Sequence, residues 1–479
     1  MSTPTTSDYL RILLVSLLVV ILGLTPYPQA AIRHLVDANR AISTGDMLSA
    51  SQNLAEAGLE FPWRYDLNIK AGYYALEAGD PKAAIQYLER PGTISHLSYS
   101  DKIKLGEAYD QAGDSLMAEA IWKDLVVQVD SRQVHEHLLS LYLQQLDYAS
   151  AVNELQALLF LNPSDIHLYY QIGSIYSAID PIKALPFLIQ AAELDSDNGA
   201  IARALHDKIR TATLFDEPSY THLIAGRQLA NTSNWELAAV AFQQATLIQP
   251  TYAEAWAFLG EARQQMAIQE TGTVSVAGLY ELDRALQVDP DSILANTFMG
   301  IYWERQEDYQ RALIYMQRAV NLSTNDAFLF TEFGNLLAKA GDLTAARAAY
   351  ERAIQLSPGD PLFYRLLADF ALQNNIQTRE LALPAARQAV SLAPDDPGSL
   401  DVMAQVMLAL QDYRSAERFL ELALQSDPSY APAYLHLGTA YLYLGETKLA
   451  QHWLSQAQAV ETESWISSQA RRMLEYYFP

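Results

Sequence analysis

Apolar residues recur along most of the chain at intervals of three and four, which places them on one face of an α-helix. The apolar stripes are about 14 residues long and are separated by short turns, so the pattern predicts pairs of amphipathic helices. Many turns read Gly-Asp, as at Gly45-Asp46 and Gly341-Asp342. We expect the glycine to end one helix in the left-handed conformation and the aspartate to cap the next helix.

The helix pairs recur with a period of about 34 residues. One copy carries Phe330, Phe333, Gly334, Leu337, Ala346, Tyr350, Ala353 and Pro358, and another carries Trp256, Leu259, Gly260, Ala285 and Pro290. Glycine also recurs inside the first helix of a pair, which we call a first helix, as at Gly106 and Gly438. Each such glycine costs about 1 kcal/mol of helix propensity. We therefore expect two helices to approach closely at these glycines.

This pattern resembles the tetratricopeptide repeat, in which an aromatic residue, Leu-Gly, Tyr, Ala, a second aromatic residue, Ala and Pro stand at fixed offsets. The resemblance covers residues 31–464, or about twelve copies at this period. It implies an all-α fold, an α-α superhelix whose stacked helix pairs form a concave groove for other proteins. A single pair cannot bury its apolar face, so neighbouring pairs must stack.

Departures from the period divide the chain into five predicted segments. Residues 1–30 form a tail and a hydrophobic segment, 31–198 an N-terminal repeat array, 199–218 an irregular linker helix, 219–464 a C-terminal array, and 465–479 a capping helix. The turns near residues 269–275 and 374–378 are also lengthened.

The run from Ile12 to Leu24 is apolar apart from Ser16 and Gly23. Extended over residues 9–27, a helix would span roughly 28 Å, close to the hydrocarbon thickness of about 30 Å. We expect one hydrophobic N-terminal helix that anchors the chain by a single pass, with the repeats on the extracytoplasmic side. A cleaved signal peptide would instead release a secreted or periplasmic protein, although Pro28 fits poorly before a cut near Ala30. A buried helix of the first repeat is a third interpretation.

The net charge of the chain limits the kinds of partner that it is expected to bind. The chain has 32 basic and 56 acidic residues, a net charge of −24 and no cysteine. Phosphate contacts need clustered basic residues, so we expect no nucleic acid partner and favour basic segments of proteins. Without cysteine there is no disulfide and no thiolate metal site.

The sequence contains no recognisable catalytic motif. In His135-Glu136-His137 the histidines stand two apart and point in different directions on a helix, whereas zinc-protease histidines stand four apart. There is no Gly-rich phosphate loop and no Gly-x-Ser-x-Gly turn. We expect no enzymatic activity, no catalytic residue, no cofactor, no metal and no small-molecule substrate.

The resemblance implies that the groove is lined by particular positions of each first helix. Carried over to this chain, these positions are Tyr170, Ser174, Tyr220, Arg227, Glu254, Glu261, Thr297, Glu304, Thr331, Asn335, Arg365, Asp369, Asp401 and Gln405. Their acidic and polar character favours basic client segments. Asn335 and Arg365 match in type the family's clamp for a C-terminal carboxylate, but its lysines are missing here.

Together these features predict a non-catalytic scaffold or adaptor that is tethered to a membrane and holds client segments in the groove. The resemblance extends to bacterial proteins that assemble complexes of the cell envelope. Two alternatives are a soluble adaptor released by signal cleavage and an accessory subunit of an envelope glycosyltransferase or polysaccharide system. A catalytic glycosyltransferase is disfavoured because the repeats leave only residues 465–479 after them.

Overall fold

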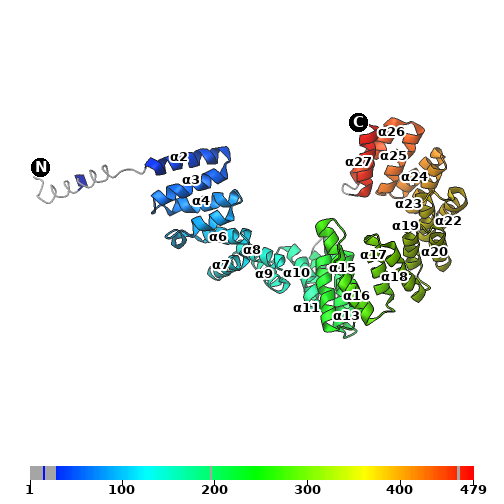
Figure 1. The fold of residues 1–479 in the computed structure, drawn as a ribbon, viewed down its shortest axis with the longest axis horizontal. Helices are drawn as coiled ribbons and strands as arrows, with labels where there is room; N and C mark the ends of the chain where they lie inside the picture. Colours follow the sequence, from blue (N-terminus) through cyan, green and yellow to red (C-terminus); the bar gives the residue numbers. More distant parts are fainter. Residues whose placement is uncertain (1–14, 17–28, 195–196, 461–463, 479) are drawn as a thin grey trace, which may run out of the picture. The chain divides into compact units, whose positions relative to one another are not determined.

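The computed structural model describes residues 15–16, 29–194, 197–460 and 464–478. These residues form α-helices joined by short turns, with no β-strand among them, so the predicted all-α repeat solenoid is confirmed (Figure 1). The predicted anchor, residues 9–27, lies outside the described residues apart from 15 and 16. Within the described part of the chain, none of the helices has the length and apolar character needed to span a bilayer.

The chain forms two compact units, residues 1–207 and residues 208–479. The first unit contains α2 (Gln29–Thr44), α3 (Met47–Glu60), α4 (Tyr65–Glu77), α5 (Pro81–Leu88), the 3-10 helix η1 (Ile94–His96), α6 (Tyr99–Gln111), α7 (Ser115–Gln128), α8 (Arg132–Gln144), α9 (Tyr148–Leu161), α10 (Ile166–Ile179) and α11 (Pro181–Leu194). The boundary between the units falls inside α12 (Gly199–Thr213), in the region predicted as a linker helix.

The second unit continues the same alternation of first and second helices. It contains α13 (Pro218–Asn231), α14 (Trp235–Ile248), α15 (Ala253–Thr271), α16 (Leu279–Val288), α17 (Ile293–Arg305), α18 (Tyr309–Leu322), α19 (Ala327–Lys339), α20 (Leu343–Leu356), α21 (Pro361–Gln373), the π-helix η2 (Thr378–Ala382), α22 (Leu383–Leu392), α23 (Pro397–Ala409), α24 (Tyr413–Ser426), α25 (Ala431–Leu444), α26 (Thr447–Val460) and α27 (Trp465–Tyr477).

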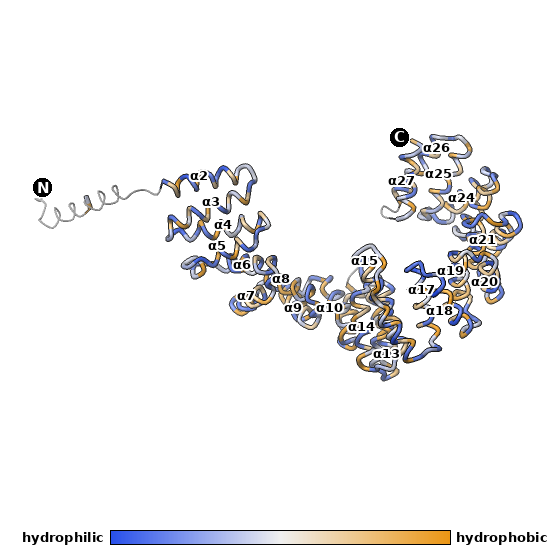
Figure 2. Tube along the Cα trace, viewed as in Figure 1, coloured by the Kyte–Doolittle hydropathy of each residue, from blue (hydrophilic) through white to orange (hydrophobic). Residues whose placement is uncertain are grey.

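From α2 to α11 and from α13 to α27 successive α-helices pack on one another, and first helices of neighbouring pairs also contact one another, as in the series α19, α21, α23 and α25. Hydrophobic and hydrophilic residues mix within the helices, as expected for elements that are buried on one side only (Figure 2). Buried side chains from Leu337 to Ala450 form one core that runs through several pairs. Stacking of neighbours therefore completes the core that a single pair lacks.

The predicted Gly-Asp turns are confirmed. Gly45 and Gly341 have φ values of +79° and +90°, in the left-handed region. The Asp46 carboxylate accepts a hydrogen bond from the Ser49 amide, and Asp342 accepts one from Ala345. Asp46 and Asp342 thus cap the helices that follow.

The glycines inside first helices mark close helix contacts, as predicted. A Cβ atom built on Gly438 of α25 would lie 2.6 Å from Cγ of Leu454 on α26, well inside van der Waals contact. The two helices can pack at this distance only because the side chain is absent. The loss of helix propensity is offset by the burial of Leu454, which is fully inaccessible to solvent.

Candidate functional site

We call one surface of the second unit the first-helix surface. It is formed by the side chains that do not enter the core on six helices, α15, α17, α19, α21, α23 and α25. Its residues come from equivalent positions, mainly the fifth and ninth of each helix, because neighbouring pairs stack in the same way. Arg365, Asp369, Asp401 and Gln405 occupy these positions on α21 and α23. Here the structure brings four of the predicted groove residues together.

Two predicted acidic residues are already neutralised within the chain. Arg305 donates hydrogen bonds of 2.7 and 2.8 Å to the two carboxylate oxygens of the nearly buried Glu261. Lys339 pairs with Glu304 at 2.7 Å. A two-point guanidinium–carboxylate pair fixes α17 against α15, so Glu261 and Glu304 stabilise the helix stack and offer little free charge.

Asp401 is 4% exposed and belongs to a network that joins two helices. Its Oδ1 lies 2.6 Å from Nδ1 of His436 on α25, and its Oδ2 accepts a hydrogen bond of 3.0 Å from Gln405. Burial by itself would lower the pKa of His436, but the Asp401 charge and hydrogen bond outweigh burial and raise it. The Asp401–His436 pair therefore ties α23 to α25 through a charged hydrogen bond.

Asp369 differs from its neighbours. Among the described residues its carboxyl group takes part in no hydrogen bond or ion pair, although it is largely shielded from solvent. Burial and the nearby Asp401 charge raise the pKa of Asp369 to about 6. Arg365 and His436 offset this only partly, because Arg365 binds Asp396 at 2.8 Å and His436 binds Asp401 at 2.6 Å. The surface around Asp369 therefore lacks one positive charge.

Several predicted groove residues are buried or already hydrogen-bonded within the chain. Thr331 is 2% exposed and donates to the carbonyl of Ala327, and Ser174 is 4% exposed on α10 of the first unit. Thr297 donates to the carbonyl of Ile293 at 2.8 Å, and Asn335 accepts from the Tyr350 hydroxyl. Short side chains at the fifth and ninth positions are thus covered by neighbouring helices or engaged within their own pair.

The remaining predicted residues lie elsewhere on the first helices. Tyr170 is half-buried on α10. Tyr220 packs edge-on against Phe215, with ring centres 5.3 Å apart. Arg227 lies 3.8 Å from Glu254 and stands over the ring of Phe258. Tyr220, Arg227 and Glu254 thus have partners at the start of the second unit, and they do not join the Asp369 group.

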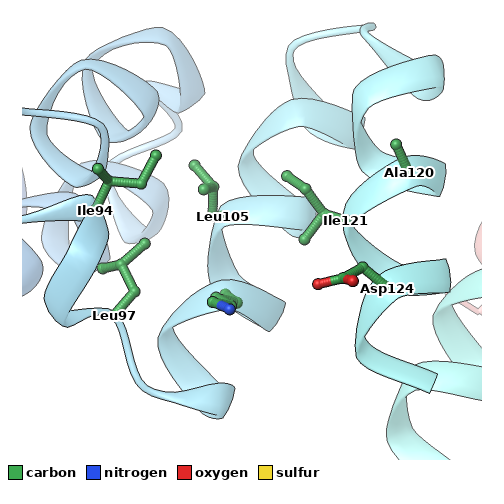
Figure 3. Close-up of a pocket in the computed structure, with 7 residues that line it drawn as sticks. Ile94, Leu97, Leu105, Ala120, Ile121 and Asp124 are labelled. Carbon is green, nitrogen blue, oxygen red and sulfur yellow. The ribbon is translucent and has the colours of Figure 1, made fainter. Parts of the chain in front are cut away.

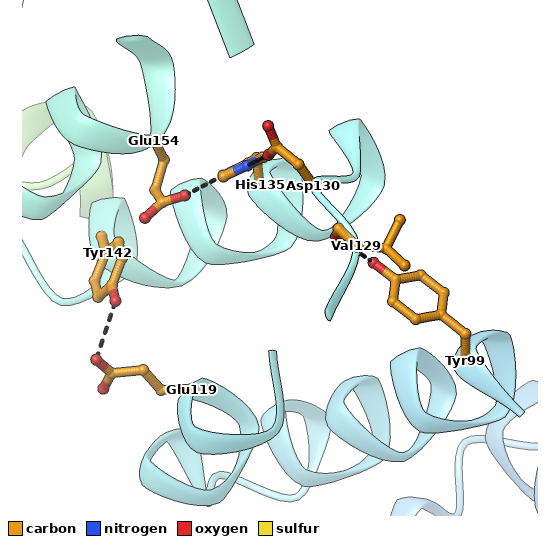
Figure 4. Close-up of polar contacts among 7 residues, drawn as sticks. All are labelled: Tyr99, Glu119, Val129, Asp130, His135, Tyr142 and Glu154. Atoms are coloured by element: carbon orange, nitrogen blue, oxygen red, sulfur yellow. Dashed lines mark hydrogen bonds and ion pairs between the residues drawn. The ribbon is translucent and has the colours of Figure 1, made fainter. Parts of the chain in front are cut away.

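The His135-Glu136-His137 motif supplies two separate contacts in the first unit. The buried His135 ring lies between Asp130 and Glu154, with nitrogen–oxygen distances of 2.6 and 2.5 Å (Figure 4). Burial alone would lower the pKa of His135, but the two carboxylates raise it. His137 instead stacks on Trp122, with ring centres 4.9 Å apart. The two imidazoles point to different partners, as the spacing predicted.

The sequence interpretation missed the basic partners on this surface, namely Arg305, Lys339 and His436. Arg305 and Lys339 are each the last residue of a first helix, α17 and α19. A signal was present: a basic residue recurs at this position in neighbouring repeats, within reach of acidic residues on the previous first helix. This signal could be recognised only with knowledge of which first helices contact one another.

Comparisons with known proteins support the repeat assignment. Two family models described as Tetratricopeptide repeat match residues 331–397 and 407–471. Tetratricopeptide repeats are therefore confirmed in these residues, whereas the count of about twelve copies stays a prediction.

Curated relatives are similar over parts of their length. Anaphase-promoting complex subunit 3 of Schizosaccharomyces pombe is 21% identical over 260 residues, which are 50% of this chain and 37% of that protein. Superkiller protein 3 of the same yeast is 22% identical over 410 residues, 74% of this chain and 27% of that protein. The chain thus spans well under two thirds of these relatives.

Solved structures of similar fold include yeast Tom70, at 13% identity and a TM-score of 0.40, covering 79% of this chain and 95% of that one. The hetero-tetramer Cut9–Hcn1 gives 14% identity and a TM-score of 0.37, covering 94% of this chain and 91% of that one.

Proposed function

We propose that the protein is a non-catalytic scaffold that binds basic segments of client proteins on the first-helix surface of the second unit. In this proposal Asp369 receives a lysine or arginine side chain of the client. The observation that supports it most directly is the unpaired Asp369 carboxyl beside the buried Asp401 charge. An incoming cation would supply the positive charge that the chain itself does not provide there.

The arrangement of charges favours basic over acidic clients. The cations Arg305, Lys339 and Arg365 are each bound to a carboxylate of the same chain. An acidic peptide would have to compete with these pairs, and it would approach a chain of net charge −24. A basic segment instead meets complementary charge, which speeds encounter and improves selectivity.

A binding assay with lysine- and arginine-containing peptides tests the proposal. Asp369→Asn removes the charge at nearly constant shape and should weaken binding about tenfold. Glu421→Gln removes one charge from an exposed position on α24 and serves as the matched control. Binding should weaken with added salt, and also below about pH 6, where Asp369 becomes protonated.

Misfolding of the Asp369→Asn variant would not explain such a loss. Because the folded-state pKa of Asp369 lies above its ordinary value of 3.8, the ionised group destabilises the fold at neutral pH. The variant should therefore be at least as stable as the natural chain at pH 7.5. Equal affinities of Asp369→Asn and Glu421→Gln would remove Asp369 from the site.

The proposal includes a membrane tether formed by residues 9–27, with the repeats on the extracytoplasmic side. It rests on the length and apolar character of that run. The mass of the mature chain, measured separately in washed membranes and in the soluble fraction, tests it. An intact N-terminus in the membrane fraction supports the tether. A soluble chain that begins near Ala31 would favour the second candidate, a secreted or periplasmic adaptor.

A further inference from the structure

Several second helices of the first unit expose large apolar side chains at the same two positions. Positions 2 and 13 of a helix are 11 residues apart, close to three full turns, so they share one face. On α7 they are Leu116 and Val127, which are 78% and 87% exposed, and position 13 of α9 is Phe160, 81% exposed. Position 2 of α11 is Ile182, 66% exposed.

Three second helices of the second unit have polar residues at both positions, so the repeat itself does not require apolar ones, although α14 (Trp235–Ile248) exposes Leu247 at position 13. The equivalent residues of α18, α20 and α24 are Gln310, Asn321, Thr344, Gln355, Arg414 and Gln425, and all are exposed. Equal positions of stacked repeats form a row. We call the apolar set on the first unit, namely Leu48, Leu59, Leu116, Val127, Phe160 and Ile182, the outer row.

An apolar hollow lies against α7, the helix that carries Leu116 and Val127 of this row (Figure 3). Helix α5 has only 8 residues, whereas its counterpart α7 has 14, and η1 follows where the rest of the helix would stand. The shortened helix leaves a cavity of about 280 Å³ lined mainly by Ile94, Leu97, Leu105, Ala120 and Ile121. Lys102 and Asp124 are its charged residues.

We propose that two copies of this chain pair through their first units, with Phe160 of each copy entering the hollow of the other. Phe160 projects from a face of α9 that carries the uncharged residues Ala149 and Asn153. The hollow is apolar and has room for a phenyl ring. Reciprocal insertion of one knob into one hollow is an isologous contact, which closes at two copies and does not propagate.

A second copy of the chain fits this surface better than a basic client segment does. The outer row and most of the hollow's lining are apolar, which favours an apolar partner surface over a basic client segment. Its side chains expose on the order of 700 Å², near the roughly 800 Å² per partner of a standard protein interface. Since both copies are acidic, added salt should strengthen the pairing by screening their repulsion. Salt should have the opposite effect on basic clients.

Sedimentation velocity of the full chain in mild detergent, over a range of protein and salt concentrations, tests the pairing. Phe160→Ala removes the knob, and Ile94→Arg blocks the hollow at a position that is already 47% exposed. Each variant alone should raise the dissociation constant at least tenfold. Ile314→Ala, at a residue 67% exposed on α18 of the second unit, is the matched control and should change nothing.

A mixture of the two variants gives the sharpest result. The Phe160→Ala copy keeps its hollow and the Ile94→Arg copy keeps its phenylalanine, so one of the two contacts can form between them. The mixture should therefore associate more tightly than either variant alone. The proposal would be overturned if the natural chain stayed monomeric or if the Phe160→Ala variant paired normally. It would also be overturned if the mixture associated no more tightly than either variant alone.

Discussion

At the scale of single residues, the turn between the two helices of a pair does not always carry glycine, the residue that suits its left-handed backbone best. Gly45 and Gly341 adopt the left-handed conformation there, but Leu146, Glu307 and Gln411 do so with side chains, at φ values of 58°, 59° and 64°. A residue with a Cβ atom is disfavoured in this conformation by roughly 1–2 kcal/mol. The repeat has kept the turn geometry at positions where the glycine is absent.

Gln411→Gly should therefore stabilise the second unit. Relief of the left-handed strain exceeds the extra entropy that glycine gives the unfolded chain, which leaves a net gain of about 0.5 kcal/mol. The free energy of unfolding in urea measures the change. Gly341→Gln, the reverse substitution in the equivalent turn, is the control and should destabilise the unit. A loss of stability in Gln411→Gly would contradict this account of the turn.

His135 should make the stability of the first unit depend on pH. Its folded-state pKa is raised by Asp130 and Glu154. The stabilising contribution is therefore complete below the ordinary pKa of 6.5 and is lost as the pH rises through the folded value. His135→Gln should cost about 1–2 kcal/mol at pH 6 and clearly less at pH 9, as measured by urea unfolding. A cost that is equal at both pH values would mean that the ring contributes by packing alone.

At the scale of elements, the helix pairs and their turns could be predicted because their signals are local. Spacing of apolar residues, Gly-Asp turns and first-helix glycines each act within one pair. The accessibility of the site could not be predicted in the same way. Thr331 and Arg365 both occupy the fifth position of a first helix, yet Thr331 is buried and Arg365 reaches Asp396. Side-chain length and the identity of the neighbouring pair decide the difference.

The hollow beside α7 escaped prediction for a related reason. The residues that follow α5 are not distinguished by composition from other turns, and the early end of the helix matters only through the neighbour that it uncovers. The basic partners of the first-helix surface raise the same difficulty, because Arg305 meets Glu261 across 44 positions of the sequence. Long-range pairing is decided by stacking, which no single repeat encodes.

The last helix, α27, completes the core of the final pair. Ile466 is 4% exposed and packs with Leu435 and Leu454. Ile466→Asp places a charge in this apolar contact and should cost about 3 kcal/mol. Hydrogen exchange should then accelerate in α25 and α26 before the rest of the second unit. Ser468→Asp adds the same charge at an exposed position of α27 and is the control. Unchanged exchange in α26 would show that the preceding pair is complete without α27.

At the scale of the whole molecule, the two compact units should unfold as separate cooperative blocks. In a repeat protein each pair is stabilised by its immediate neighbours, so a defect spreads through the contacts of its own unit. The boundary inside α12 interrupts this series of contacts. Unfolding in urea should accordingly show two transitions, each of which responds to substitutions in one unit only.

Two substitutions that each create a cavity in the core of one unit test this expectation. Trp122 on α7 and Phe363 on α21 are 1% and 2% exposed, and replacing either by alanine should cost about 3–5 kcal/mol. Trp122→Ala should lower the transition of the first unit and leave that of the second unchanged, and Phe363→Ala should do the reverse. Hydrogen exchange followed by mass spectrometry assigns each transition to its residues. If either variant shifted both transitions equally, the stabilising contacts would have to cross α12, and the chain would be one cooperative stack.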